Sequence, residues 1–186
     1  LETNKGKGSA VKLGLQHTKG EYIVIQDADL EYDPQDLLKF EEVFQKFDAD
    51  GIIGSRFTYD KYTRSHSILN KIGNYILTLI FNILYDTTFT DIYSCYFAFK
   101  RNLIDANSLK SEGFVEHAEI LSKAIKCGSK FYEVPINYNG RNYSEGKKIR
   151  FYHFLPVLFQ IFIGRFKWEN YIALTILLFF FLFVIL

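Results

Sequence analysis

Short apolar runs alternate with helical patterns along most of the chain. The apolar runs predict strands over residues 22–25, 51–54, 93–99 and 130–136. The spacing of apolar residues predicts a helix before the first strand, over residues 9–17, and further helices between strands, over residues 34–47 and 115–126. This alternation is typical of an α/β domain built on a largely parallel sheet.

The first strand and the helix that follows it have the clearest local signals. Residues 22–25 are continuously apolar, as in a parallel strand that is buried on both faces. Asp33 can serve as the N-cap of the next helix, and Pro34 occupies its first position. Asp36 falls in the first turn, where a negative charge is favourable.

The last part of the chain has a different pattern. Residues 171–186 contain no charge, glycine or proline, and Arg165, Lys167 and Trp168 precede them. Cationic and aromatic residues before a uniformly apolar run predict the start of a transmembrane helix within 169–186. A buried core helix is the alternative. The preceding positive charges favour the cytoplasmic side of the membrane for the rest of the chain.

Two other segments, 67–85 and 150–167, are apolar but interrupted by polar residues. Both suit either core helices or helices that lie in the membrane interface. The interface is favoured for the second segment, because it adjoins the apolar run, and the first is evenly balanced. We therefore expect an α/β domain over 1–150, an interfacial amphipathic segment over 151–168 and the start of a transmembrane helix over 169–186.

Composition narrows the possible functions. The chain has 186 residues, of which 48% are hydrophobic and 23% charged, so it can bury a core. A formal net charge of +1 argues against a nucleic-acid-binding protein. The two cysteines have no CxxC spacing, which argues against a disulfide framework and a structural zinc site. Because methionine is absent, we interpret the chain as a fragment of a longer protein.

Charged residues gather where the predicted strands end. Asp27 and Asp29 directly follow the first strand, where ligands bind in an open α/β sheet. Two carboxylates at this position can hold a hard divalent cation, which in turn neutralises a diphosphate. Upstream, the glycine-rich basic segment 4–8 leads into a helix and could receive phosphate oxygens. Further cations follow the second strand and occupy a late loop: Arg56, Arg141, Lys147 and Lys148.

Five segments, taken in order, resemble family 2 glycosyltransferases. They read NKGKGSAVKLGL, YIVIQDADLEYDP, GSRF, TDIYSCYFAFKR and YEVPINYNGRNYSEGKK, and together they span residues 4–151. The closest branch acts on polyprenyl phosphates and includes the dolichol-phosphate mannosyltransferases. The resemblance implies a GT-A fold, a nucleotide-sugar donor, Mg²⁺ or Mn²⁺, and inversion at the anomeric carbon. Nothing in the chain corresponds to the strand and loop with which the family holds the nucleotide base.

The resemblance also implies roles for individual residues. Asp27 and Asp29 match the residues that bind the metal and the donor, and Glu31 could complete the metal shell. Glu119 matches an acidic residue on a helix, although a surface carboxylate is an equal alternative. Asp91 either orients the acceptor region or caps the turn into the 93–99 strand. The positions that match phosphate-facing cations are Lys7, Arg56, Arg141 and either Lys147 or Lys148.

The charge of the acceptor distinguishes the possible reactions. A sugar hydroxyl needs a base to remove its proton, whereas a lipid phosphate is already an anion and needs cations and a metal. The cations of 141–150 stand just before the predicted interfacial segment, which favours a polyprenyl-phosphate acceptor. A hydroxyl of a lipid-linked glycan or polysaccharide is the alternative, with Asp91, Glu116 or Glu119 as base. A non-catalytic, membrane-anchored binding module is the second alternative.

Overall fold

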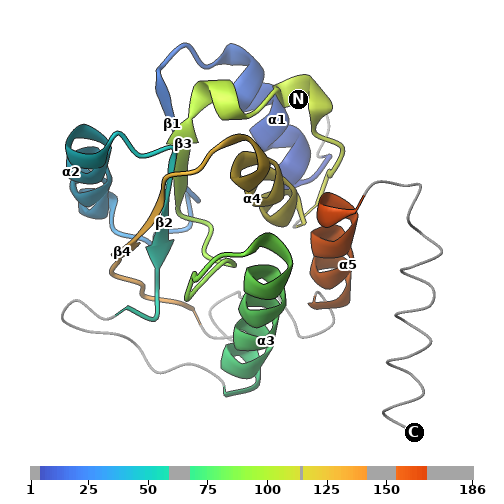
Figure 1. Ribbon diagram of the computed structural model, residues 1–186. Coiled ribbons are helices and arrows are strands. Elements are labelled where there is room, and N and C mark those ends of the chain that lie inside the picture. Colours follow the sequence, from blue (N-terminus) through green and yellow to red (C-terminus); the bar gives the residue numbers. More distant parts are fainter. Residues whose placement is uncertain (1–4, 59–67, 114, 142–153, 167–186) are drawn as a thin grey trace, which may run out of the picture.

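The computed structural model describes residues 5–58, 68–113, 115–141 and 154–166 (Figure 1). In this part of the chain, a four-stranded sheet lies between helices on its two sides. The helices are α1 (Lys7–His17), α2 (Leu37–Phe47), α3 (Ile68–Tyr85), α4 (Glu116–Cys127) and α5 (Phe154–Arg165). The strands are β1 (Tyr22–Ile25), β2 (Gly51–Ser55), β3 (Phe97–Lys100) and β4 (Phe131–Pro135). The α/β class is thus confirmed, and each element predicted between residues 9 and 136 is present, although the strand predicted over 93–99 covers only Phe97–Lys100.

The strand order is β1-β3-β2-β4, and the sheet is mixed. β3 is antiparallel to both of its neighbours, β1 and β2, whereas β2 and β4 are parallel. The expectation of a mostly parallel sheet therefore needs correction, although β1, β2 and β4 do run in the same direction. Apolar runs predict that strands exist but carry no information on their direction, so the insertion of β3 could not be foreseen.

The first strand is not buried on both faces, contrary to expectation. β1 is an edge strand in which Ile23 and Ile25 are buried, whereas Tyr22 and Val24 are exposed by 38% and 39%. The ring of Tyr22 packs against Phe44 of α2, with ring centroids 4.2 Å apart. An apolar side chain is thus compatible with a half-covered strand face, and a short apolar run cannot distinguish the two environments.

Each face of the sheet has its own core. On one side, Phe40 and Phe44 of α2 pack against Ile52 of β2. On the other side, α3, α4 and α5 pack against the sheet through a larger set of buried residues, among them Ile53, Phe81, Phe97, Ile120 and Ile161. Figure 1 shows α2 alone on its side, with α1, α3, α4 and α5 opposite.

The helix predicted over 67–85 is present as α3, and part of the segment predicted over 150–167 is present as α5. Among the described helices, α3 alone is long and apolar enough to cross a membrane. Of its 18 residues, 33% are buried. Its buried residues belong to the core, and the Tyr85 hydroxyl donates a hydrogen bond of 3.0 Å to the Ile161 carbonyl of α5. The predicted transmembrane run, 169–186, lies outside the described residues.

Gly164 allows α5 to approach its neighbours closely. A Cβ atom at Gly164 would lie 2.6 Å from the Tyr85 hydroxyl and 2.8 Å from Cβ of Ser122. We expect Gly164→Ala to lower the free energy of unfolding by about 1–2 kcal/mol, because overpacking displaces the helix. Chemical denaturation of the protein would measure the change.

Gly14 provides the matched control for this substitution. It lies inside α1, and a Cβ atom there would meet nothing within 4 Å. Gly14→Ala should therefore stabilise the protein by about 0.5–1 kcal/mol through helix propensity alone. An equal gain at Gly164 would show that α5 does not pack on Tyr85 and Ser122 as described.

Candidate active site

The functional residues gather at one edge of the sheet. β1, β2 and β4 end there, and β3 begins there, because it runs in the opposite direction. Asp27 and Asp29 follow β1, Arg56 follows β2, Asp91 lies shortly before β3, and Arg141 lies after β4. The sheet topology thus brings together residues that are more than 100 positions apart in the sequence.

Lys7, at the start of α1, connects two carboxylates. Its Nζ lies 2.7 Å from Oδ1 of Asp27 and 3.5 Å from Oε1 of Glu116 on α4. Burial opposes the charge of Lys7, but the surrounding anionic groups, including Glu116 and Asp27, keep its pKa above the ordinary value. Burial raises the pKa of Glu116, and Lys7 opposes this shift.

The glycines beside Lys7 have a packing role. Gly6 has a positive φ of 88°, and a Cβ atom at Gly6 or Gly8 would collide with the main chain of Ser111 and Glu112. The Gly8 amide donates a hydrogen bond of 2.9 Å to the Glu112 carbonyl. The glycine-rich loop is thus fixed against the segment before α4, which sets the position of Lys7. Phosphate binding by this loop stays a prediction.

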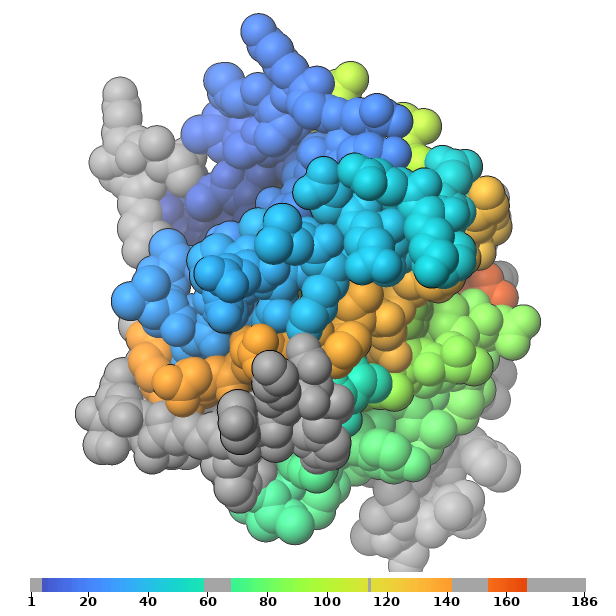
Figure 2. Space-filling model, turned by 90° about the vertical axis from the view of Figure 1, so that its left-hand side faces the viewer, coloured from blue at the N-terminus to red at the C-terminus, as the bar shows by residue number. Residues whose placement is uncertain are grey.

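Asp29 and Glu31 share one cation, Arg141. Nη2 of Arg141 lies 2.7 Å from Oδ2 of Asp29, and its Nε lies 2.9 Å from Oε1 of Glu31. Tyr138 donates its hydroxyl hydrogen to the other Glu31 oxygen, over 2.9 Å. Partial burial opposes ionisation of Glu31, but these donors bring its pKa below the ordinary value. Figure 2 shows the residues after β4, in orange, lying against the blue segment that follows β1.

The predicted metal ligands are therefore separated by cations. Within the described ranges, no group of three or more His, Cys, Asp or Glu side chains could hold a metal ion. Asp27 faces Lys7, whereas Asp29 and Glu31 face Arg141. The oxygens are of the kind that Mg²⁺ prefers, and Mg²⁺ often uses only one or two carboxylates together with substrate phosphates. Asp27 and Asp29 fit that requirement, without Glu31 as a third ligand.

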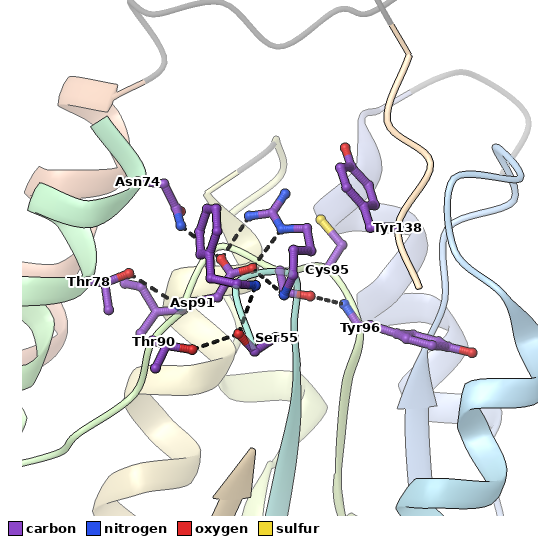
Figure 3. Close-up of polar contacts among 12 residues, drawn as sticks. Ser55, Asn74, Thr78, Thr90, Asp91, Cys95, Tyr96 and Tyr138 are labelled. Atoms are coloured by element: carbon purple, nitrogen blue, oxygen red, sulfur yellow. Dashed lines mark hydrogen bonds and ion pairs between the residues drawn. The ribbon is translucent and has the colours of Figure 1, made fainter. Parts of the chain in front are cut away.

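Arg56 and Asp91 form a buried ion pair (Figure 3). Nε and Nη2 of Arg56 donate to Oδ2 and Oδ1 of Asp91 over 2.7 and 2.8 Å, and the Arg56 amide also donates to Oδ2. Burial opposes ionisation of Asp91, but Arg56 holds its pKa below the usual range. The guanidinium also lies over the Tyr138 ring, 5.2 Å from its centroid.

The segment that carries Asp91 is itself fixed from β2 and β4. Ser55 and Thr90 are joined by a hydrogen bond of 2.6 Å between their hydroxyl groups. Glu133 of β4 accepts hydrogen bonds from the amides of Thr90 and Asp91, over 2.8 and 3.2 Å. Asp91 thus fixes Arg56, and orientation of the acceptor region by Asp91 stays a prediction.

Among the described residues, the Glu119 carboxylate makes its hydrogen bonds to the loop before α4 and not to the groups around Arg56 or Lys7. Its carboxylate accepts from the amides of Lys110 and Ser111, over 2.8 to 3.1 Å, and pairs with Lys123 at 3.2 Å. Burial opposes its ionisation, but these donors lower its pKa. Glu119 thus holds the loop before α4, whereas Glu116, one turn earlier, is the helix carboxylate that reaches Lys7.

Comparison with known proteins identifies the family. The model of the family described as glycosyl transferase family 2 matches residues 1–107. The chain belongs to this family. The match covers the first four of the five segments that carry the resemblance, and the predicted family is confirmed.

Two archaeal relatives illustrate the similarity. The glycosyltransferase AglJ of Haloferax volcanii is 31% identical over 142 residues, which cover 76% of this chain and 46% of that protein. A dolichol-phosphate mannosyltransferase of Pyrococcus furiosus is 29% identical over 180 residues, covering 89% of this chain and 46% of that enzyme. The chain thus spans about half the length of these relatives.

Solved structures of another glycosyl-transferring enzyme share the fold. Glucosyl-3-phosphoglycerate synthase from Mycobacterium tuberculosis, in complex with phosphoglyceric acid, superimposes with a TM-score of 0.59 at 15% identity. The match covers 86% of this glycosyltransferase chain and 55% of the synthase. The likeness supports the GT-A fold of the described domain.

Sequence reasoning missed two residues of this site. Tyr138, which contacts both Glu31 and Arg56, has no signal in the sequence beyond its place near Arg141. Asn74 donates a hydrogen bond of 2.9 Å to Asp91 from α3. A signal did exist for it, since Asn74 and Thr78 are polar residues one helical turn apart within an apolar segment. Lys147 and Lys148 lie outside the described residues, so their role stays a prediction.

The buried ion pair makes a testable contribution to stability. We expect Asp91→Asn to lower the free energy of unfolding by about 3 kcal/mol at neutral pH, because Arg56 would stay buried without a counter-charge. Since the pKa of Asp91 is lowered on folding, its contribution is complete above about pH 4 and disappears as the pH falls through the native pKa. Denaturation at several pH values would show whether the variant lacks this acid dependence.

Asp48→Asn is the control for that experiment. Its side chain is 71% exposed and pairs with Lys100 and Lys130 at the surface. Exposed pairs contribute little, so the variant should unfold almost like the wild type. Similar losses in the two variants would contradict a special role for the buried pair.

Proposed function

We propose that this family 2 glycosyltransferase moves a sugar from a nucleotide-sugar donor to a polyprenyl phosphate at a membrane surface. The observation that carries the proposal is the meeting of carboxylates and cations at one sheet edge. Asp27 and Asp29 are there to serve the donor, and Arg56 and Arg141 to serve phosphate groups. The similarity to a dolichol-phosphate mannosyltransferase supports the choice of acceptor.

The apolar surface of α3 and α5 supports a membrane location. α3 packs against α5, and each buries one face while exposing large apolar side chains on the other. The exposed residues are Ile68, Leu69, Ile72, Tyr75, Ile76, Leu79 and Ile83 on α3, and Leu155 and Phe159 on α5. An exposed patch of this kind suits contact with lipid. We propose that both helices lie at the interface, with 151–168 leading into a transmembrane helix within 169–186.

The sidedness of the domain follows from the charges near the apolar run. Arg165 and Lys167 stand just before it, and positive residues are enriched on the cytoplasmic side of membrane proteins. We therefore place the domain over 1–150 on the cytoplasmic face of the membrane. The near-neutral composition gives no support to a nucleic-acid partner.

Asp27 and Asp29 are the residues that would hold Mg²⁺ or Mn²⁺. A crystal structure of the mycobacterial synthase, which shares this fold, contains Mn²⁺ together with UDP-glucose, and this supports a divalent metal at the proposed site. When bound, such an ion supplies charge neutralisation for the departing nucleoside diphosphate. Lys7 and Arg141, which now pair with the two carboxylates, are the nearest described cations for the phosphates of the donor.

The reaction with a lipid phosphate needs no base on the protein. The phosphate oxygen is already anionic, so the chain must bring two negatively charged partners together. Arg56 suits this task because Asp91 and the rings around it fix its guanidinium, leaving little freedom to lose on binding. Transfer then breaks the bond between the anomeric carbon and the diphosphate of the donor as the lipid oxygen attacks from the opposite face.

Transfer to lipid in membranes is the direct test of this proposal. Membranes that contain the full-length protein would receive labelled nucleotide sugars, Mg²⁺ or Mn²⁺, and polyprenyl phosphate. We expect label in the organic phase that depends on metal and lipid phosphate and is released by mild acid. Asp29→Asn should lower the rate by at least about 100-fold, because it removes a carboxylate that would hold the ion that neutralises the departing diphosphate.

The control for Asp29→Asn is Asp33→Asn. Asp33 lies in the same loop, but its side chain accepts a hydrogen bond from the Gln35 amide and so caps a short helical turn at Pro34–Asp36. Its replacement should leave transfer almost unchanged. Equal activity of the Asp29→Asn variant and the wild type would contradict the proposal. Donor binding without any transfer would favour the non-catalytic binding module.

A second candidate is transfer to a hydroxyl of a lipid-linked glycan or polysaccharide. Glu116 favours it, because burial raises the pKa of this carboxyl and its Oε2 has no hydrogen-bond partner in the described part of the chain. A carboxylate poised in this way can accept a proton. In this reaction Glu116 would act as base, and Glu119 would keep its structural role.

The two glutamates of α4 distinguish the candidates. If the acceptor is a lipid phosphate, Glu116→Gln should retain transfer within about tenfold, because no proton is removed. If the acceptor is a hydroxyl, the same change should lower kcat by about 100-fold or more and abolish the acidic limb of the pH profile. Glu119→Gln, which weakens the loop at 110–111, should lower thermal stability and leave the pH profile unchanged.

A further inference from the structure

Two polar residues, Asn74 and Thr78, lie on the buried face of α3, one helical turn apart. Figure 3 shows both side chains directed toward the segment before β3. Asn74 Nδ2 donates to Oδ1 of Asp91 over 2.9 Å, and the Thr78 hydroxyl accepts from the Ile92 amide over 3.4 Å. Because a carboxylate paired with an arginine can only accept hydrogen bonds, the NH₂ group must be the end of Asn74 that faces Asp91.

Asn74 controls one oxygen of the Asp91 carboxylate. Oδ2 receives the amide and Nε of Arg56, whereas Oδ1 receives Nη2 of Arg56 and the Asn74 amide. Of these four donors, Asn74 is the one that does not belong to Arg56 itself. It therefore fixes the plane of the carboxylate independently of the arginine, and a bidentate pair requires the two groups to share that plane.

Packing alone does not explain an asparagine at this position. Asn74 is 7% exposed, and its Oδ1 has no hydrogen-bond partner within the described ranges. Burial of an unsatisfied amide oxygen is unfavourable, and an apolar side chain would avoid this penalty. The contact with Asp91 is the compensating interaction that the structure shows.

We propose that Asn74 is a positioning residue for the acceptor phosphate. By holding Oδ1 of Asp91, it sets the direction in which Arg56 presents its guanidinium to a phosphate. The inference rests on the proposed function, in which Arg56 meets the lipid phosphate. The opposite face of α3 is apolar and exposed, and it is the face proposed to contact the membrane. Asn74 therefore connects the position of this helix in lipid, through Asp91, to the position of Arg56.

Steady-state kinetics of the full-length protein in membranes would test this role. Asn74→Ala should raise the KM for polyprenyl phosphate about tenfold, as expected for loss of one hydrogen bond to a charged group. The KM for the nucleotide sugar should stay at the wild-type value, because the donor carboxylates do not contact Asn74. Asn74→Asp, which has the same shape but turns a negative oxygen toward Asp91, should raise the lipid KM further.

Thr78→Val is the matched control. Thr78 occupies the same buried face of α3, but it binds a main-chain amide rather than the carboxylate. The variant should keep both KM values within about twofold, which corresponds to a fraction of one hydrogen bond. Melting curves of all variants would show whether they are folded, and Asn74→Ser, which keeps a small polar side chain without a charge, is the variant to use if Asn74→Ala does not fold.

The outcomes separate the inference from the function on which it rests. A folded Asn74 variant with the wild-type KM for lipid phosphate would overturn the inference, as would an equal rise of KM for both substrates. A wild-type protein that transfers sugar but ignores polyprenyl phosphate would overturn the proposed acceptor itself, and the positioning role with it. A selective rise of the lipid KM supports both.

Discussion

The ion pair of Asp91 with Arg56 is the interaction on which the rest of the site depends. A buried carboxylate and a largely buried guanidinium are each unfavourable alone, so each requires the other. The pair also joins three parts of the fold. Arg56 directly follows β2, Asp91 lies in the segment before β3, and Asn74 belongs to α3. Tyr138, whose ring lies beside the guanidinium, extends the connection to the segment after β4 and to Glu31.

The same pairing of opposite charges recurs across the sheet edge. Lys7 with Asp27, and Arg141 with Asp29 and Glu31, are partly exposed and therefore weaker than the buried pair. This difference suits the proposed roles. The buried pair would keep its geometry, whereas the outer pairs could be exchanged when a phosphate or a metal ion offers a stronger partner. Without such a ligand, each of these cations already has a carboxylate partner.

The sequence predicted the helices, the strands and the grouping of charged residues better than it predicted the contacts that these residues make. Apolar periodicity located β1, β2 and α4 almost to the residue, and the strand ends marked the end of the sheet at which Asp27, Asp29 and Arg56 lie. The direction of β3 could not be predicted, because strand pairing depends on distant parts of the chain. The same limit applied to the helix glutamates. Glu116 and Glu119 lie on the same helix, and only the folded position of Lys7 and of the loop at 110–111 distinguishes them.

The half-covered edge strand has a practical consequence for anyone who prepares this stretch of chain. Among the described residues, no strand pairs with the outer side of β1, and Tyr22 and Val24 are exposed beside that edge. A row of free main-chain donors and acceptors next to apolar side chains accepts strands from other molecules and favours aggregation. Covering the outer side of β1 with other polypeptide should therefore raise solubility. A preparation in which further polypeptide shields that edge should remain dispersed at concentrations where the bare domain associates.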